Sequence, residues 1–399
     1  MKTMNKAWLI WFIASIFYAY QYILRVMPSI MLSDIMQEFH LDAATFGQFS
    51  GVYYLGYSLM HLPMGIALDR FGPRYVMTAC LLMMSMGLLP LVYCDDWIYP
   101  ILGRVIIGMG SSAAILGAFK IIRMSFNEDR FTRMLSLCVT IGLIGAIYGG
   151  GPVSHLSALY GYQNVIKSLA ALGLILATIT FMTIPDLKTA QKTRVLSDLI
   201  GVLSQHNVIV LCCLSGLMVG PMEGFADVWG AEFLKRAYHI NPVTANYLPS
   251  MIFIGMCFGG PILSAIAEKS GYYLETIAGA GLVMLTMFTL LLTTQLTESM
   301  IAVGFTLVGV CSAYQILAIY KASTYVPDHV AGLTTAVANM IIMGFGYAFH
   351  ISIGGMINAN HNTPLAFTYG IAIIPFTLAI GALGFFILAW REGRVSNVN

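Results

Sequence analysis

Charged residues are scarce in this sequence. Asp, Glu, Lys and Arg make up 10% of its 399 residues, whereas 58% are hydrophobic and the mean hydropathy is +0.80. About a quarter of the residues in an ordinary soluble domain are charged, so the composition excludes a cytosolic enzyme. The formal net charge of +2 is too small to indicate a nucleic-acid partner. The chain is therefore predicted to be an integral membrane protein surrounded by the lipid bilayer.

The sequence also lacks motifs for metal, disulfide or nucleotide chemistry. Its seven cysteines are an odd number and form no CxxC pair or Cys/His spacing, so we expect neither a disulfide scaffold nor a metal site. No Walker A motif occurs, which excludes ATP-driven transport by this chain. No cluster of catalytic His, Asp or Ser residues is present, so the sequence predicts no cofactor, no catalytic residues and no enzyme activity.

Long apolar runs are abundant. A helix needs about 20 residues to cross the hydrocarbon core of a bilayer. Twelve runs qualify, namely residues 7–34, 43–68, 74–93, 97–123, 131–156, 163–184, 207–235, 242–267, 273–293, 299–321, 330–357 and 364–390. The predicted fold is therefore all-α, with twelve transmembrane helices in two six-helix bundles. The first bundle spans residues 1–184 and the second spans residues 207–399, and a cytoplasmic linker of residues 185–206 joins them.

Lysine and arginine indicate the orientation. If the N-terminus is cytoplasmic, most of the 20 Lys and Arg residues fall in segments on the cytoplasmic side, as the positive-inside rule requires. Lys2 and Lys6 precede the first run as in a signal peptide, but no small-residue cleavage site follows. No N-x-[ST] sequon occurs, which fits a bacterial membrane. We predict a multi-pass protein of the bacterial inner (cytoplasmic) membrane with both termini in the cytoplasm.

An internal repeat relates the two halves. Residues 65–72 and 264–271 align at an offset of 199, with an acid, a base and a glycine in register. Lys120 in the fourth run corresponds to Lys321 in the tenth at an offset of 201. The two bundles are therefore predicted to be pseudo-symmetric, and parallel repeats of this kind are typical of transporters.

Two motifs point to a family. The loop after the second run is Gly65-Ile-Ala-Leu-Asp69-Arg70-Phe71-Gly72-Pro73-Arg74. It resembles the signature loop between helices two and three of the major facilitator superfamily, although Tyr75 stands at the second basic position. In the fourth run, Arg104-Val-Ile-Ile-Gly108-Met-Gly110 is similar to that family's Arg-x-x-x-Gly-x-Gly motif, with Ile107 in place of the usual polar residue. The resemblance covers essentially the whole chain.

A finer resemblance concerns the first run. Its Tyr18-x-x-Gln21-Tyr22-x-x-Arg25 pattern is similar to a bacterial nutrient-uptake branch that includes the phagosomal amino-acid and nucleoside transporters. The resemblance implies a monomeric secondary active transporter that moves a small polar solute, anionic or zwitterionic and amino-acid-like, by alternating access. Proton-coupled uptake, with protons as the coupling partner, is the first interpretation. Proton-driven efflux of drugs or metabolites is the alternative.

The signature loop supplies candidate gating residues. The resemblance implies that ion pairs of this loop stabilise one conformation of the transporter and break in another. The residues that match the motif are Gly65, Asp69, Arg70, Gly72 and Arg74. The alternative is ordinary anchoring by positive charges on the cytoplasmic side.

Two arginines lie inside predicted spans and are candidate solute-binding residues. Arg25 and Arg104 lie roughly 7 Å and 9 Å outward of the centres of their runs, at 1.5 Å per residue. An arginine at such a depth faces a water-filled cavity or a partner, so each could receive a solute carboxylate or phosphate. The alternative is a structural role, in which the guanidinium binds backbone carbonyls or an acid.

Aromatic and polar residues extend this candidate site. Tyr18 and Tyr22 share a helix face with Arg25 at i, i+4 and i+7 spacing. Tyr314 and Gln315 in the tenth run stand where the repeat has alanines in the first half. Side chains of this kind form specific, partly apolar pockets.

Two acids lie deep in the seventh run. Glu223 is near its centre and Asp227 is one turn away on the same face. Burial favours the protonated carboxyl group and a nearby arginine favours the carboxylate, which suits a proton-coupling site. The alternative is a structural pairing with an arginine of the first half. Gly220-Pro221 just before them predicts a local break in the helix.

Overall fold

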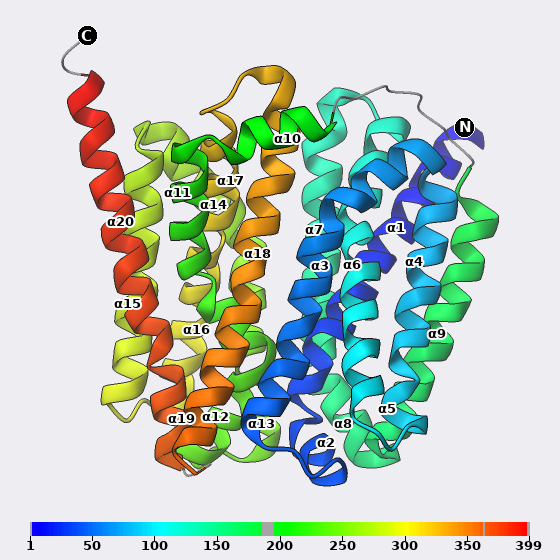
Figure 1. The fold of residues 1–399 in the computed structure, drawn as a ribbon, viewed down its shortest axis with the longest axis vertical. Coiled ribbons are helices and arrows are strands. Elements are labelled where there is room, and N and C mark those ends of the chain that lie inside the picture. The colour runs from blue at the N-terminus through cyan, green and yellow to red at the C-terminus, as the bar shows by residue number, and fades with distance from the viewer. Residues whose placement is uncertain (1, 186–194, 362–363, 397–399) are drawn as a thin grey trace. The chain divides into compact units, whose positions relative to one another are not determined.

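The chain divides into two compact helical units, Met1–Thr193 and Arg194–Asn399 (Figure 1). The computed structural model describes residues 2–185, 195–361 and 364–396. No strand occurs in these ranges, as the apolar runs predict. Most of the predicted linker charges fall in residues 186–194 and lie outside the described residues. The described end of the linker contains α10 (Val195–Leu203), which packs against α18.

The first unit is a bundle in which α3 and α6 lie side by side and α1 packs against α7. Its described elements are α1 (Lys2–Val26), η1 (Met27–Ser29), α2 (Leu32–Glu38), α3 (Ala43–Phe71), α4 (Pro73–Leu88), α5 (Pro90–Tyr93), α6 (Ile98–Ser125), α7 (Glu128–Gly149), α8 (Gly151–Tyr160) and α9 (Tyr162–Thr183).

The second unit repeats this plan, with α14 packed against α16 and α11 against α18. After α10, its described elements are α11 (His206–Leu217), η2 (Gly220–Trp229), α12 (Gly230–Ala237), α13 (Pro242–Tyr247), α14 (Ser250–Ser270), α15 (Tyr273–Thr293), α16 (Glu298–Ser312), α17 (Tyr314–Ser323), α18 (Asp328–Ala359), α19 (Pro364–Ile371) and α20 (Ile373–Ser396).

Among the described residues, eleven helical spans are long and apolar enough to cross a membrane, judged by length and composition. They match eleven of the twelve predicted runs. The other run is α3, a helix of 29 residues that is less apolar because it carries Gln48, three tyrosines and His61. With α3 included, the structure has the twelve long helical segments that the sequence predicts.

The first span ends earlier than residue 34, where the sequence places its end. α1 stops at Val26, η1 covers the next three residues, and α2 is a separate short helix. The cause is Pro28, which has no N–H to donate to the carbonyl of Leu24 four residues before it. Arg25 therefore lies in the last turn of α1, farther from the centre of the helix than predicted.

Glycines bring α3 and α6 into backbone contact in the first unit. A methyl group added at Gly108 would lie 2.0 Å from the carbonyl oxygen of Tyr53, and one at Gly56 would lie 2.4 Å from that of Val105. Cβ atoms do not approach a carbonyl so closely, so both positions require glycine.

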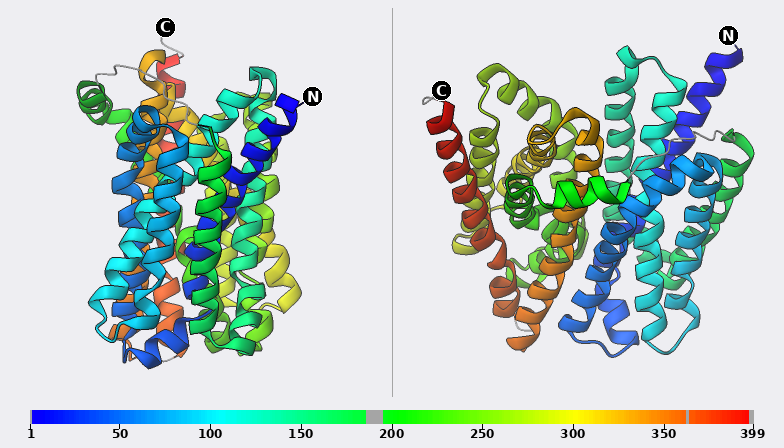
Figure 2. Two further views of the ribbon diagram at one scale, coloured as in Figure 1. Left: turned by 90° about the vertical axis from the view of Figure 1, so that its right-hand side faces the viewer. Right: turned by 45° about the horizontal axis from the view of Figure 1, so that its top comes forward.

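The same contacts recur in the second unit. A methyl group at Gly309 would lie 2.0 Å from the carbonyl oxygen of Ile252, and one at Gly255 would lie 1.9 Å from that of Thr306. All four residues follow their first-unit counterparts at offsets of 199 for α14 and 201 for α16. The predicted repeat is thus confirmed as a repeat of helix packing. Figure 2 shows the long helices of each unit in two further views.

Candidate functional site

Arg25 lies among aromatic rings in the first unit. Its guanidinium carbon is 5.1 Å from the ring centroid of Tyr22 and 5.2 Å from that of Tyr54 on α3. Tyr18 lies against Tyr22 with ring centroids 5.1 Å apart, so the face that the sequence predicts for α1 is present. The arginine is 6% exposed, and stacking on rings is a favourable setting for a desolvated guanidinium.

Arg104 binds the backbone at the end of α1. Its Nη1 donates to the carbonyl of Leu24 at 2.6 Å, and its Nη2 donates to the carbonyl of Arg25 at 2.9 Å. The Leu24 carbonyl is the one that Pro28 leaves without a helical donor. The guanidinium also lies 4.7 Å from the ring centroid of Tyr53. Arg104 thereby fixes the backbone that carries Arg25.

The sequence reasoning missed the tyrosines of α3. Tyr54 contacts Arg25, and Tyr53 stacks on Tyr57 with centroids 6.3 Å apart. The ring of Tyr57 in turn lies against the ring of His61, with centroids 5.3 Å apart. The signal that could have found them is the lower hydropathy of this run, because a membrane helix with polar aromatic residues at i, i+4 and i+8 has a functional or packing reason for them.

Glu223 and Asp227 lie in a π-helix of the second unit. The predicted break is present, because α11 ends at Leu217 and η2, a π-helical segment with i→i+5 bonding, begins at Gly220. Both acids are 0% exposed. The wider π-turn places residues four apart almost directly above one another, so the two carboxyl groups share one face of η2.

Aromatic and glycine contacts hold η2 in place. Phe225 packs edge-on against Phe288 and Phe305, each with ring centroids 5.2 Å apart. On another side, a methyl group added at Gly220 would lie 2.7 Å from the ring of Phe349 on α18. π-Helical segments are rare and are frequently found at functional sites, so this fixed segment with two buried acids is a candidate site.

Tyr314 and Gln315 begin α17. The Tyr314 hydroxyl donates to the carbonyl of Ser215 on α11 at 2.6 Å, so it connects two helices near the start of η2. Gln315 is buried as well. Within the described residues, its Nε2 has no hydrogen-bond partner.

The signature loop closes one end of the first unit. Gly72 adopts φ +83° and ψ 160° between α3 and α4, a conformation that is nearly restricted to glycine. Lys120 of α6 donates to Asp69 Oδ1 at 2.8 Å and to the carbonyl of Leu68 at 2.7 Å. Arg74 lies 4.2 Å from the ring centroid of Phe181 on α9.

The other two loop residues have fewer contacts. Arg70 lies over the ring of its neighbour Phe71. A methyl group added at Gly65 would come no closer than 4.0 Å to Leu116. Packing inside this unit therefore does not explain why glycine stands at residue 65.

The equivalent end of the second unit uses another acid. Lys321 donates to Glu392 Oε2 of α20 at 2.9 Å, and the Tyr325 hydroxyl donates to the other oxygen of the same carboxylate. Burial, together with the nearby Glu392, raises the pKa of Tyr325 well above its usual range.

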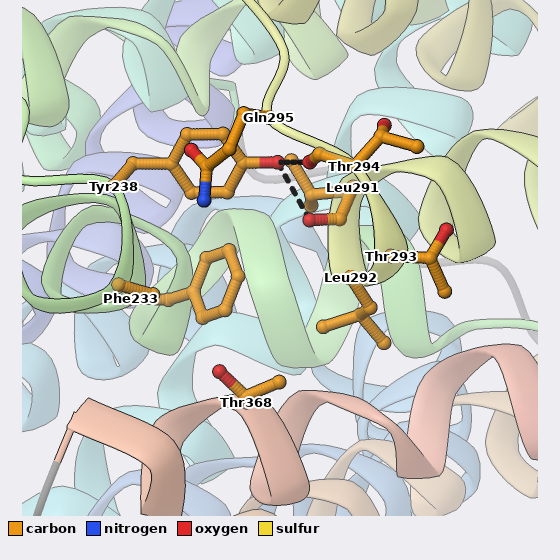
Figure 3. A pocket seen from close by; sticks show the side chains of 9 residues that line it. Phe233, Tyr238, Leu291, Leu292, Thr293, Thr294, Gln295 and Thr368 are labelled. Carbon is orange, nitrogen blue, oxygen red and sulfur yellow. Dashed lines mark hydrogen bonds between the residues drawn. The ribbon is translucent and has the colours of Figure 1, made fainter.

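A small pocket of about 130 Å³ opens in the second unit, between the ends of α12 and α15 and the middle of α19 (Figure 3). The Tyr238 hydroxyl donates there to the carbonyls of Leu291 at 2.6 Å and Thr294 at 2.9 Å, and burial raises the pKa of Tyr238. None of the predicted site residues lines this pocket. Among the described residues, no group of three or more His, Cys, Asp or Glu side chains is arranged to hold a metal ion.

Curated relatives of the chain are transporters. It is 24% identical to the uncharacterized transporter YybO of Bacillus subtilis (strain 168) over 278 residues, which are 67% of this chain and 63% of that protein. It is 22% identical to the probable L-galactonate transporter of Escherichia coli (strain K12) over 270 residues, 63% of this chain and 59% of that one. The chain thus spans about three fifths of the length of these two relatives.

Solved structures share the fold. A mutant of the nucleoside transporter NupG has a TM-score of 0.79 at 14% identity, over 95% of this chain and 99% of that one. A bacterial homolog of the human lysosomal transporter Spinster has a TM-score of 0.72 at 17% identity, over 96% of this chain and 95% of that one. A POT family transporter in complex with 5-aminolevulinic acid has a TM-score of 0.74 at 12% identity, over 98% of this chain and 96% of that one.

The family model described as the Major Facilitator Superfamily matches residues 10–349. This match covers the signature loop, the arginines of the first unit and the acids of the second. With twelve long helical segments in two repeated units, the chain is a multi-pass membrane transporter that belongs to the major facilitator superfamily.

Proposed function

We propose that this transporter takes up a small polar organic anion or zwitterion, amino-acid-like in size, across the bacterial inner membrane. It works as a monomer by alternating access, driven by protons that enter with the solute, and both termini lie in the cytoplasm. The observation that carries the solute class is Arg25. A guanidinium buried in a membrane-spanning helix is costly, and one that is surrounded by tyrosine rings suits a carboxylate.

The other predicted residues take supporting roles in this proposal. Tyr18 and Tyr22 form the wall of the solute site beside Arg25, and Gln315 is the candidate solute contact of the second unit. Arg104 and Tyr314 act through the backbone, because their donors bind carbonyls at helix ends. The signature loop, with its Asp69–Lys120 pair, controls the change between conformations.

Two comparisons are consistent with an anionic solute. The Escherichia coli relative is named for L-galactonate, which carries a carboxylate. The POT family structure holds 5-aminolevulinic acid, which carries a carboxylate and an amine. Both solutes fall within the class that a buried arginine selects.

Glu223 is the proposed proton carrier, with Asp227 beside it on η2. Both carboxyl groups are fully buried, so the protonation state of either one depends strongly on whether its surroundings are open to water. A group with this property can bind a proton on one side of the membrane and release it on the other.

Uptake into proteoliposomes tests the proposal. Purified protein would first be screened by thermal shift against amino acids, organic acids, nucleosides and peptides, because a bound solute raises the melting temperature. The solute that binds is then followed in vesicles with an inward, an outward and no proton gradient. We expect concentrative uptake with the inward gradient only. Accumulation with the opposite gradient would instead establish efflux.

A further inference from the structure

Three sides of α1 are occupied by neighbouring helices. The carbonyl of Ala19 and the Cα of Ile23 lie against glycines of α7. The Tyr20 hydroxyl donates to a carbonyl of α9 at 3.0 Å. The carbonyl of Leu24 accepts from α6. These four residues mark the three sides on which α1 packs against α7, α9 and α6, and the ring of Tyr18 also contacts Gly142 of α7.

The remaining side of α1 is polar. Tyr18, Gln21, Tyr22 and Arg25 fall within an arc of about 100° when successive residues are turned by 100°. Gln21 stands one turn before Arg25, so the two side chains are neighbours on this face. The amide and the guanidinium are therefore close enough to contact one small solute together.

Gln21 is buried but its donor is not satisfied within the protein. The side chain is 2% exposed, and its Nε2 has no hydrogen-bond partner among the residues that the structure describes. A buried polar group in this state destabilises the fold, and buried polar groups are otherwise almost always bonded. An apolar side chain would pack at less cost, so the amide has another purpose.

We propose that Gln21 is a specificity-determining residue that hydrogen-bonds a hydroxyl or carbonyl oxygen carried by the solute near its carboxylate. The inference rests on the proposed function, because it takes Arg25 as the residue that receives the carboxylate. It narrows the solute class from organic anions and zwitterions in general to hydroxy- or oxo-substituted ones.

The chemistry of the amide supports this choice of group. A neutral amide cannot neutralise a second charge, so an uncharged oxygen beside the carboxylate suits it better than another ionised group. Its NH₂ donates to a carbonyl or hydroxyl oxygen, and its own oxygen accepts from a hydroxyl. A solute without such an oxygen leaves the amide unsatisfied, and binding sites of this type discriminate strongly against the analogue that lacks the group.

Matched solute pairs test the inference. Lactate would be compared with propionate, pyruvate with propionate, and serine with alanine, on the parent protein and on Gln21→Met, whose side chain has similar length and no hydrogen bond. The matched control is Gln48→Met, because Gln48 is exposed on α3. Dissociation constants and the melting temperature of the solute-free protein are measured for each variant.

We expect the parent to prefer the substituted member of at least one pair by about ten-fold or more. Gln21→Met should reduce that ratio to about one by weakening the substituted member only. It should also raise the melting temperature without solute by about 2 °C, because an unsatisfied donor is removed. Gln48→Met should change neither quantity.

Other outcomes overturn the inference. If Gln21→Met keeps the preference, or lowers the melting temperature, Gln21 is a structural residue. Gln21→Leu repeats the test should the methionine variant fail to fold, and unfolding of both variants also assigns a structural role. These results leave binding of the anion to Arg25 intact. If no anion or zwitterion binds the parent, and Arg25→Ala changes nothing, the proposed function itself fails and the inference falls with it.

Discussion

Lys120 and Lys321 stand at equivalent positions of the two units, yet they bind different carboxylates. Lys120 binds Asp69 at the end of α3. The counterpart of Asp69 is Glu268, which is exposed, and Lys321 binds Glu392 of the last helix instead. The lysine is thus repeated but its partner is not. In the first unit the pair joins the signature loop to α6, and in the second it joins α17 to α20.

The first long helix of each unit shows a similar contrast. Pro28 ends α1, and Pro221 lies at the start of η2. In each case a side chain from another helix donates to a nearby carbonyl. The donor is the charged Arg104 in the first unit and the neutral Tyr314 in the second.

These differences show what a repeat of helix packing does and does not conserve. The glycine-to-carbonyl contacts recur at the same offsets in both units, because any side chain would push the helices apart. Polar groups are not restricted in this way, and they have diverged. The buried arginines lie in the first unit and the buried Glu223 and Asp227 in the second, which assigns solute binding and proton coupling to different halves in our proposal.

Removing Arg25 should have the largest effect. Arg25→Ala should weaken binding of the transported solute by more than about 100-fold, because a buried charge partner is lost. Arg25→Lys should recover only part of the affinity, since lysine lacks the planar fork of donors. Isothermal titration measures both, with the exposed Arg123→Ala as control. Normal binding by Arg25→Ala would rule out its role as the anion receptor.

Neutralising Glu223 should separate coupling from binding. Glu223→Gln should abolish accumulation driven by a proton gradient but preserve solute binding and exchange across the membrane, because it mimics the permanently protonated acid. Asp227→Asn should do less. Proteoliposome uptake with and without an inward gradient measures the difference. Gradient-driven accumulation by Glu223→Gln would transfer the role to Asp227 or to a buried histidine, His61 of α3 or His350 of α18.

The shared packing predicts equal damage in the two units. Gly108→Ala and Gly309→Ala should each cost about 3 kcal/mol through overpacking against backbone. Each should lower the melting temperature by several degrees. Gly279→Ala is the matched control, because a methyl group there meets nothing within 4 Å and alanine favours the helix. A marked difference in stability between Gly108→Ala and Gly309→Ala would show that the two repeated contacts do not contribute equally to the stability of their units.

The signature loop should affect rates rather than affinity. Asp69→Asn should slow transport several-fold and leave binding within about three-fold, because the change biases a conformational equilibrium and not the solute site. The Asp69 side chain is 60% exposed, so its pair with Lys120 contributes little stability. Glu268→Gln, at the equivalent position, should leave the rate unchanged. Initial rates and dissociation constants on both variants decide whether gating is confined to the first unit.

Tyr314→Phe should have the smallest effect. Loss of one neutral hydrogen bond to the Ser215 carbonyl should cost about 1 kcal/mol, with solute affinity kept within about two-fold. Arg104→Met should cost more and should weaken binding as well, because it releases the backbone of Arg25. Thermal melting and titration on both variants compare the two donors directly. A larger loss of affinity in Tyr314→Phe would make Tyr314 a solute contact.

The sequence by itself determined the membrane fold, the repeat and one face of the site. Low charge and twelve apolar runs require membrane-spanning helices, whatever their neighbours are. The offsets of 199 and 201 predict the packing repeat, and the spacing of Tyr18, Tyr22 and Arg25 predicts their shared face. These features depend on composition and on the helical period, which are local properties.

Only the tertiary structure decided the partners. Arg25 and Arg104 are alike in sequence, but one stacks on tyrosines and the other binds the backbone that Pro28 leaves short of a donor. The contact of Tyr54 with Arg25, the π-helical form of the segment around Glu223 and the choice of Glu392 by Lys321 were not predictable either. Each depends on which helix lies opposite and on where a helix ends, and side chains far apart in the chain meet only after the bundle has packed.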